Sequence, residues 1–177
     1  MAVNEFKQHE KRIKTLIENK AHDEALAECN ALLAQQPELK AEVLRLRAYV
    51  HAHRGMYDEA IADRETLIDE GLAILRDYYQ LGDNSMSAGR FKEASKWFHE
   101  VLRRGAEQNE TWFDSAALLL LSYAQMRLGQ LQEAQRNLDK AVAIDAECAM
   151  PVRGAGIVTH QSLREEIQRL ASGAAKR

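Results

Sequence analysis

The chain has 177 residues, of which 24 are Lys or Arg and 27 are Asp or Glu, so its formal net charge is −3 at pH 7. This balance and a pI near 6.1 exclude the strongly basic surface that a nucleic-acid backbone requires, and no nucleic-acid partner is expected. Only two residues are Pro, and the abundance of Ala, Leu, Glu and Gln favours helix with almost no β structure. The length fits a single domain, residues 1–177.

The amino terminus alternates charged and apolar residues and lacks the apolar core of a secretion signal. The longest apolar run, 116–121, is far shorter than the roughly 20 residues that cross a bilayer. We therefore expect no membrane span. Cys29 and Cys148 are distant in sequence and belong to no metal-binding motif. Two lone cysteines are typical of a reduced, cytoplasmic protein.

Taken in chain order, the apolar residues predict four helical hairpins, at residues 5–37, 40–71, 74–105 and 111–146. Each hairpin contains one copy of a short block, at 20–25, 55–60, 89–94 and 129–134. The block begins with Gly in three of the four copies, and all four copies end in Glu followed by Ala. A pattern that recurs at this spacing indicates a repeat protein.

Each part of the block has a physical reason. The Gly can adopt positive φ and end a helix. The Glu then lies in the first turn of the next helix, where its charge complements the helix dipole. The Ala allows two helices to approach closely, and small residues seven positions before the Gly favour the same close crossing. These small residues are Ala48, Gly82 and Ser122. Each block therefore predicts the corner of a helical hairpin.

The repeat pattern stops after Ala146. Pro151, Gly154 and Gly156 predict a loop over residues 147–161. A short amphipathic helix is then expected at 162–172, with Ile167 and Leu170 on one face. The last repeat of a solenoid needs a covering element, so this helix is interpreted as a cap. The alternative is that it occupies the binding groove or pairs with another subunit.

The repeated pattern resembles the tetratricopeptide repeat (TPR) family, whose unit is a helical hairpin of about 34 residues. The resemblance covers about residues 6–146 and is strongest in the third repeat, which carries Gly82, Gly89, Ala94 and Phe98 in their expected places. It implies an all-α fold, a superhelical solenoid of about four TPR hairpins with a C-terminal capping helix. The first repeat departs from the pattern at Ile13 and Lys20, and the second at Arg64, which replaces an apolar residue.

The resemblance also implies where a partner would bind. In TPR proteins, certain positions of the first helix of each hairpin line a concave groove. Carried over to this chain, those positions predict a partner-binding groove that includes Lys14, Arg45, Tyr49, Arg76, Tyr79, Asp83, Tyr123 and Met126. Tyr and Arg are enriched where interfaces are strongest. For the three tyrosines, the alternative is that they fill space between adjacent first helices.

No catalytic, cofactor-binding or metal-binding motif is found, so no enzyme activity, cofactor or metal is expected. His51 and His53 are two residues apart on a predicted helix and point to different faces. The acidic pair Asp23 and Glu24 is explained by its position at a helix start. The sequence contains no phosphate-binding loop and no HExxH motif.

The sequence thus favours a protein–protein interaction module, an adaptor or small chaperone that binds a peptide or helix of another protein. One alternative is a dedicated chaperone or neutralising partner of a single effector, similar to secretion chaperones built from such repeats. Another is a self-assembling scaffold, in which the chain forms a homo-oligomer.

Overall fold

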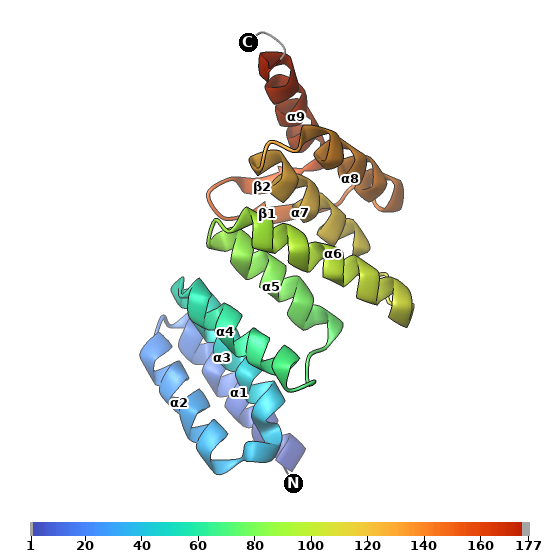
Figure 1. Ribbon diagram of the computed structural model, residues 1–177. Coiled ribbons are helices and arrows are strands. Elements are labelled where there is room, and N and C mark those ends of the chain that lie inside the picture. The colour runs from blue at the N-terminus through green and yellow to red at the C-terminus, as the bar shows by residue number, and fades with distance from the viewer. Residues whose placement is uncertain (1, 175–177) are drawn as a thin grey trace. The chain divides into compact units, whose positions relative to one another are not determined.

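The computed structural model describes residues 2–174, and side chains are described for residues 6–173. The chain folds as two compact units, residues 1–77 and 78–177. Each unit is built mainly of helices that are adjacent in sequence and pack in antiparallel pairs (Figure 1). The two units are described separately below.

Unit 1 contains the first two predicted hairpins. Its helices are α1 (Ala2–Glu18), α2 (His22–Gln35), α3 (Lys40–Arg54) and α4 (Tyr57–Asp69), with a single 3₁₀ turn, η1 (Pro37–Leu39), between the hairpins. Helix α2 packs against α1 and α3, and α1 also contacts α3. The core between these helices consists of apolar side chains, among them Ile13, Cys29 and Val43, which are fully buried.

Unit 2 begins within α5 (Leu75–Ser87) and contains α6 (Phe91–Gln108), α7 (Asp114–Arg127), α8 (Leu131–Ile144), β1 (Ala149–Val152), β2 (Gly156–Thr159) and α9 (His160–Ala174). Helix α7 packs against both α6 and α8, and α9 packs mainly against α8. The eight helices expected from the repeats are therefore all present within the described residues, at the expected places in the chain.

The block residues form the helix corners as predicted. Gly55, Gly89 and Gly129 have φ values of 82°, 75° and 76°, the left-handed conformation that ends a helix without a steric penalty for Gly. The block alanines Ala25, Ala60, Ala94 and Ala134 are fully buried. Ser122 Oγ donates a hydrogen bond to the carbonyl oxygen of Ala134 at 2.7 Å, so the small residue and the block Ala meet at the helix crossing.

The first corner differs because Lys20 stands where the other repeats have Gly. Lys20 nevertheless adopts the left-handed conformation, with φ of 60°. The hydrogen bonds from Lys20 N–H to Ile17 O and from Ala21 N–H to Leu16 O, both 2.9 Å, close the turn as in the other repeats. Packing of α1 on α2 thus imposes the corner on a residue that does not favour it.

Two boundaries differ from the sequence prediction. Helix α6 runs to Gln108, three residues beyond the predicted end of the third hairpin at residue 105. The C-terminal helix α9 begins at His160, two residues before the predicted start, because Thr159 and Ser162 exchange hydrogen bonds that close its first turn.

The predicted loop at 147–161 is wrong in part, since it contains a two-stranded antiparallel hairpin. Strand β1 pairs with β2 in the register Ala149 to Thr159 through Val152 to Gly156. Gly154, with φ of 79°, takes the third position of a turn closed by Ala155 N–H and Val152 O at 3.0 Å. The Pro and Gly residues that indicated a loop in fact form the strand edge and the turn.

Candidate functional site

Four of the predicted groove residues, Lys14, Arg45, Tyr49 and Arg76, belong to unit 1. Lys14 is exposed on α1, and its Nζ forms an ion pair with Glu10 Oε1 at 2.6 Å. Arg76 is exposed in the first turn of α5. The exposed pair on α1 presents both signs of charge and contributes little to stability.

Arg45 is turned toward the protein rather than toward solvent. Its Nε donates to Asp77 Oδ2 at 2.9 Å, and its second guanidinium nitrogen donates to the carbonyl oxygen of Leu72 at 2.6 Å. Arg64 Nη1 also donates to Asp77, at 3.0 Å. The three side chains form a charge cluster that holds the α4–α5 connection against α3. Arg45 is therefore occupied by intramolecular contacts.

Tyr49 is the most accessible aromatic residue of the predicted groove. It is 40% exposed on α3, and its ring lies edge-to-face against His53 at a centroid distance of 4.2 Å. Burial lowers the pKa of His53, and nearby His22 lowers it further. At neutral pH the Tyr49–His53 pair therefore presents two uncharged aromatic rings and a hydroxyl group, and Tyr is enriched at interface hot spots.

The groove residues of unit 2 are mostly buried. Tyr79 is only 7% exposed, and its ring stacks on Phe113 at 4.7 Å and meets the edge of Phe98 at 5.9 Å. Trp112 continues the stack on the other side of Phe113, at 4.3 Å. Burial, with a smaller effect of the half-buried Asp83, raises the pKa of Tyr79. These contacts favour the space-filling alternative for Tyr79.

Tyr123 and Met126 are also buried, at 7% and 6% exposure. All residues of α7 from Ala117 to Met126 are buried, because β1 and α9 contact α7 in addition to α6 and α8. A helix that is buried on every side cannot offer an open groove face. The β-hairpin thus covers the part of α7 on which the sequence placed a binding surface.

Of the eight predicted residues, the structure brings Tyr123 and Met126 together, in the wall of a pocket between α7, β2 and α9. It joins Arg45 to Asp77 and Arg64, which were not predicted as neighbours. Arg127, which the TPR spacing also places on the groove side of its helix, lines the same pocket, whereas sequence reasoning missed Ile157, which lines it as well. Apolar residues at alternate positions, Met150 and Val152, precede the two glycines, and Val158 follows them. This pattern is typical of a β-hairpin and could have identified it.

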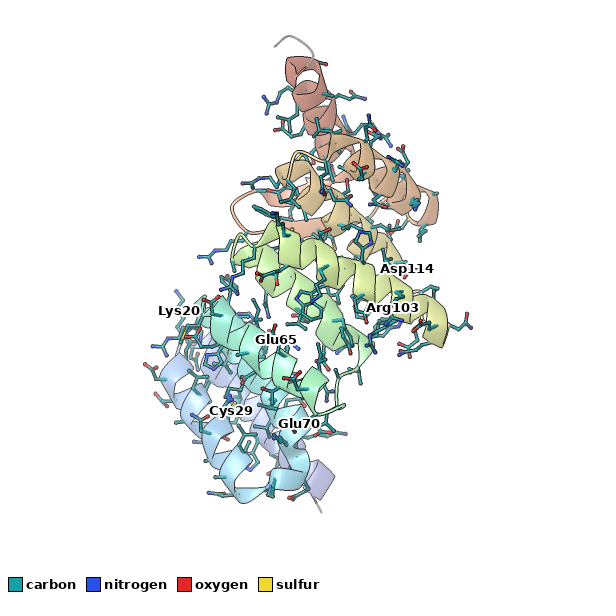
Figure 2. All side chains as sticks on the ribbon, in the orientation of Figure 1. Lys20, Cys29, Glu65, Glu70, Arg103 and Asp114 are labelled. Atoms are coloured by element: carbon teal, nitrogen blue, oxygen red, sulfur yellow. The ribbon has the colours of Figure 1, made fainter. Side chains whose placement is uncertain are left out.

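Other described titratable residues bear on metal binding and nucleophilic reactivity. No group of three or more His, Cys, Asp or Glu that could hold a metal ion occurs within residues 2–174. Burial lowers the pKa of His51 and raises the pKa of the Cys29 thiol to about 12, so Cys29 (Figure 2) is a poor nucleophile. No helix among the described residues is long and apolar enough to cross a membrane.

Known proteins that are similar to this chain are built from the same kind of helical hairpin. Residues 115–148 match the model of the tetratricopeptide repeat. No curated protein matches the chain at a significant level. Among solved structures, the chain is similar to the TPR-like repeats of a Podosopora anserina protein described as a kinesin light chain, with 19% identity, a TM-score of 0.70, and coverage of 98% of this chain and 88% of that one.

It is also similar to MamA from Desulfovibrio magneticus RS-1, with 18% identity, a TM-score of 0.67, and coverage of 97% and 96% of the two chains. A tetratricopeptide repeat protein from Parabacteroides merdae has 18% identity and a TM-score of 0.60, and the match covers 93% of this chain and 58% of that one. At these identities the likeness concerns the fold. The expected all-α TPR-like solenoid and the resemblance to TPR proteins are confirmed.

Proposed function

We propose that this chain is a non-enzymatic adaptor or small chaperone of the cytoplasm that binds a peptide segment of a partner protein. The TPR fold indicates a protein–protein interaction module. The lone cysteines, one of them buried and unreactive, support a reduced compartment. The absence of a clustered catalytic arrangement among the described residues agrees with a binding role.

The observation that carries this proposal is the exposed Tyr49–His53 pair on α3. Helices α1 and α3 are the first helices of their hairpins and contact each other, so the two helices together form one face of unit 1. Tyr49 is exposed on α3, Lys14 is exposed on α1 and pairs with Glu10, and the TPR spacing gives Tyr49 and Lys14 corresponding positions on the two helices. An amphipathic aromatic ring beside mixed charges suits a peptide that carries both apolar and polar residues.

The binding site proposed here is narrower than the eight-residue groove. Arg45 is held by Asp77 and Leu72, and Tyr79, Tyr123 and Met126 are buried. Of the predicted groove residues of unit 1, Lys14 on α1, Tyr49 on α3 and Arg76 on α5 stay exposed. We call Lys14, Tyr49 and His53 the α1–α3 face.

A capture experiment tests the proposal. Tagged wild-type protein and the variant Tyr49→Ser would be used to isolate partners from native extract, with quantification by mass spectrometry. The matched control is Glu65→Ser on α4, an exposed side chain of unit 1 (Figure 2). We expect Tyr49→Ser to lose the partner and Glu65→Ser to retain it. Equal recovery by all three proteins would contradict a role for the α1–α3 face.

The same experiment separates the alternatives. A single partner recovered in a fixed ratio would favour a dedicated chaperone or neutralising protein, and several partners would favour an adaptor. Sedimentation of the purified chain at increasing concentration addresses self-assembly. A scaffold would form larger species, whereas an adaptor would stay at one mass.

A further inference from the structure

The β-hairpin has one buried face and one exposed face. Val152 and Val158 are 8% and 5% exposed and point toward the helices. Pro151 and Ile157 face each other across the two strands, and Ile157 is 64% exposed. A large apolar side chain is thus presented to solvent at the end of the repeat array.

The outer edge of β2 has unused backbone groups. Residues opposite each other in an antiparallel pair alternate between those that exchange two hydrogen bonds and those that exchange none. Pro151 has no N–H, so the Pro151–Ile157 pair cannot exchange two bonds. Thr159, two residues on from Ile157, confirms this alternation, because its N–H donates to Ser162 Oγ at 3.0 Å instead of pairing with β1. The N–H and C=O of Ile157 therefore point away from β1.

A pocket of about 390 Å³ lies beside this edge. It is lined by Ile157 and Val158 and by Ser162, whose Oγ accepts the outward-pointing N–H of Thr159, so it lies at the outer edge of β2. Tyr123 and Met126 of α7 and Leu163 of α9 form its other apolar walls. A short strand edge next to an apolar pocket is the arrangement by which proteins bind extended peptides.

The charge at the pocket is positive and uncompensated. Arg127 lines the pocket, donates to Tyr123 Oη at 3.1 Å and lies over the Phe91 ring at 4.5 Å, but it forms no ion pair with a described carboxylate. Glu166 also lines the pocket, but Arg169 binds both of its carboxylate oxygens, at 2.8 and 2.5 Å. A carboxylate of a ligand would therefore pair with Arg127 without displacing another carboxylate.

We propose that the outer edge of β2 binds an extended peptide that carries apolar side chains and carboxylates. The peptide backbone pairs with the N–H and C=O of Ile157, an apolar side chain enters the pocket, and an Asp or Glu side chain pairs with Arg127. This site belongs to unit 2 and is independent of the α1–α3 face, so the two proposals can fail separately.

The test is a direct binding measurement with the purified full chain. Two fluorescein-labelled, eight-residue peptides would be compared by fluorescence anisotropy, one repeating Val-Val-Glu-Glu and one repeating Val-Val-Lys-Lys. In either peptide each face of the extended chain alternates an apolar and a charged residue. We expect saturable binding of the Glu peptide, at least tenfold tighter than that of the Lys peptide. Equal affinities, or no saturable binding of the Glu peptide, would overturn the proposal.

Variants of Arg127 test the charge. Arg127→Gln should abolish the preference for the Glu peptide, and Arg127→Lys, which keeps the charge, should retain most of it. The control Arg136→Gln removes an exposed cation of α8 that pairs with Glu133 and should leave the preference unchanged. If Arg127→Gln still preferred the Glu peptide by tenfold, the assigned role of Arg127 would be wrong.

Variants of Ile157 test the strand edge. Ile157→Pro removes an N–H that points away from β1, together with the isoleucine side chain, and we expect at least tenfold weaker binding of the Glu peptide. Ile157→Thr keeps the N–H and should bind more tightly than Ile157→Pro. Equal affinities of the two Ile157 variants would overturn strand pairing. Circular dichroism would establish that each variant keeps its fold. If Ile157→Pro does not fold, the Arg127 variants decide the proposal.

Discussion

Arg64 donates a hydrogen bond to Asp77 across 3.0 Å, and the two side chains are 4% and 0% exposed. Burial lowers the pKa of Arg64, and Arg64 Nε has no hydrogen-bond partner. Asp77 also accepts from Arg45 Nε and from the backbone N–H of Ile74, both at 2.9 Å. The carboxylate is thus the centre of the cluster, and Arg64 is one of several donors around it.

Because Asp77 is the centre of the cluster, we expect a substitution of Asp77 to lower the stability of the fold more than a substitution of Arg64. Asp77→Ala leaves the buried Arg64 and the half-buried Arg45 without an anion and should cost roughly 3–5 kcal/mol of unfolding free energy. Arg64→Met restores the apolar residue that the repeat pattern expects and leaves Asp77 paired with Arg45, so its effect should stay within about 1 kcal/mol.

Urea unfolding measures both variants, and trapping of Cys29 with iodoacetamide in a Cys148→Ser background follows unit 1 specifically, because Cys29 is fully buried there. If Arg64→Met lowered the unfolding free energy as much as Asp77→Ala, Arg64 would be shown to be required for folding.

Lys20 provides a second test of unit 1. Its φ of 60° is unfavourable for a residue with a Cβ, whereas Gly adopts it freely. Lys20→Gly (position in Figure 2) should therefore raise the unfolding free energy by up to about 1 kcal/mol. Gly55→Ala at the next corner, where φ is 82°, should lower it by a similar amount. Urea unfolding measures the free energy of unfolding of both variants. If Lys20→Gly were no more stable than wild type, the corner at Lys20 would not be strained.

The crossing of α5 and α6 gives a third prediction. A Cβ added at Gly82 would lie 2.6 to 2.9 Å from three atoms of the Phe98 ring, and such overpacking costs roughly 1–3 kcal/mol. The fourth repeat has Ser122 and Leu138 at the corresponding positions. The double variant Gly82→Ala with Phe98→Leu should therefore lose less stability than the sum of the two single variants. A double-mutant cycle from thermal unfolding measures this coupling, and strict additivity would contradict it.

The sequence predicted the helices well because the repeat is defined by local rules. A positive-φ Gly, an acidic first turn and a small crossing residue each act within one hairpin, so Gly55, Gly89 and Gly129 were sufficient to locate the corners. The hairpin at 149–159 was missed because its strands are only four residues each. Strands of this length give too few alternating positions to distinguish them from a loop.

The groove was harder to predict because exposure depends on distant residues. The TPR spacing places Tyr49 and Tyr123 at the same position of their helices and Tyr79 one turn earlier in its own, and the burial of each is decided by what covers it. Phe113 and Phe98 cover Tyr79, and the C-terminal segment covers α7. Among the described residues, the aromatic ring beside Tyr49 is that of His53, and Tyr49 remains 40% exposed. The pattern therefore identified the face but not its accessible part.

The exposed network on α6 predicts a pH dependence. Glu100 accepts hydrogen bonds from Arg103 Nε at 2.9 Å and Arg104 Nε at 2.6 Å, and these lower its pKa to about 2. Because the folded-state pKa is lower than the unfolded value of about 4.3, the carboxylate stabilises the fold above pH 4.3 and loses this effect as the pH falls toward 2.

The Arg103 side chain is 51% exposed, so the contribution should stay below about 1 kcal/mol. Urea unfolding of wild type and Glu100→Gln should show a difference at pH 6 that shrinks at pH 2.5. A difference that is the same at both pH values would contradict this assignment.

The central claim is that the α1–α3 face binds a partner protein, and site-specific photo-crosslinking tests it most directly. A photoreactive phenylalanine would replace Tyr49 in one protein and Glu65 in another, both exposed positions of unit 1. After irradiation in cells, the account predicts one or a few discrete crosslinked proteins from position 49 and none of these from position 65. The same products from both positions, or none from position 49, would contradict it.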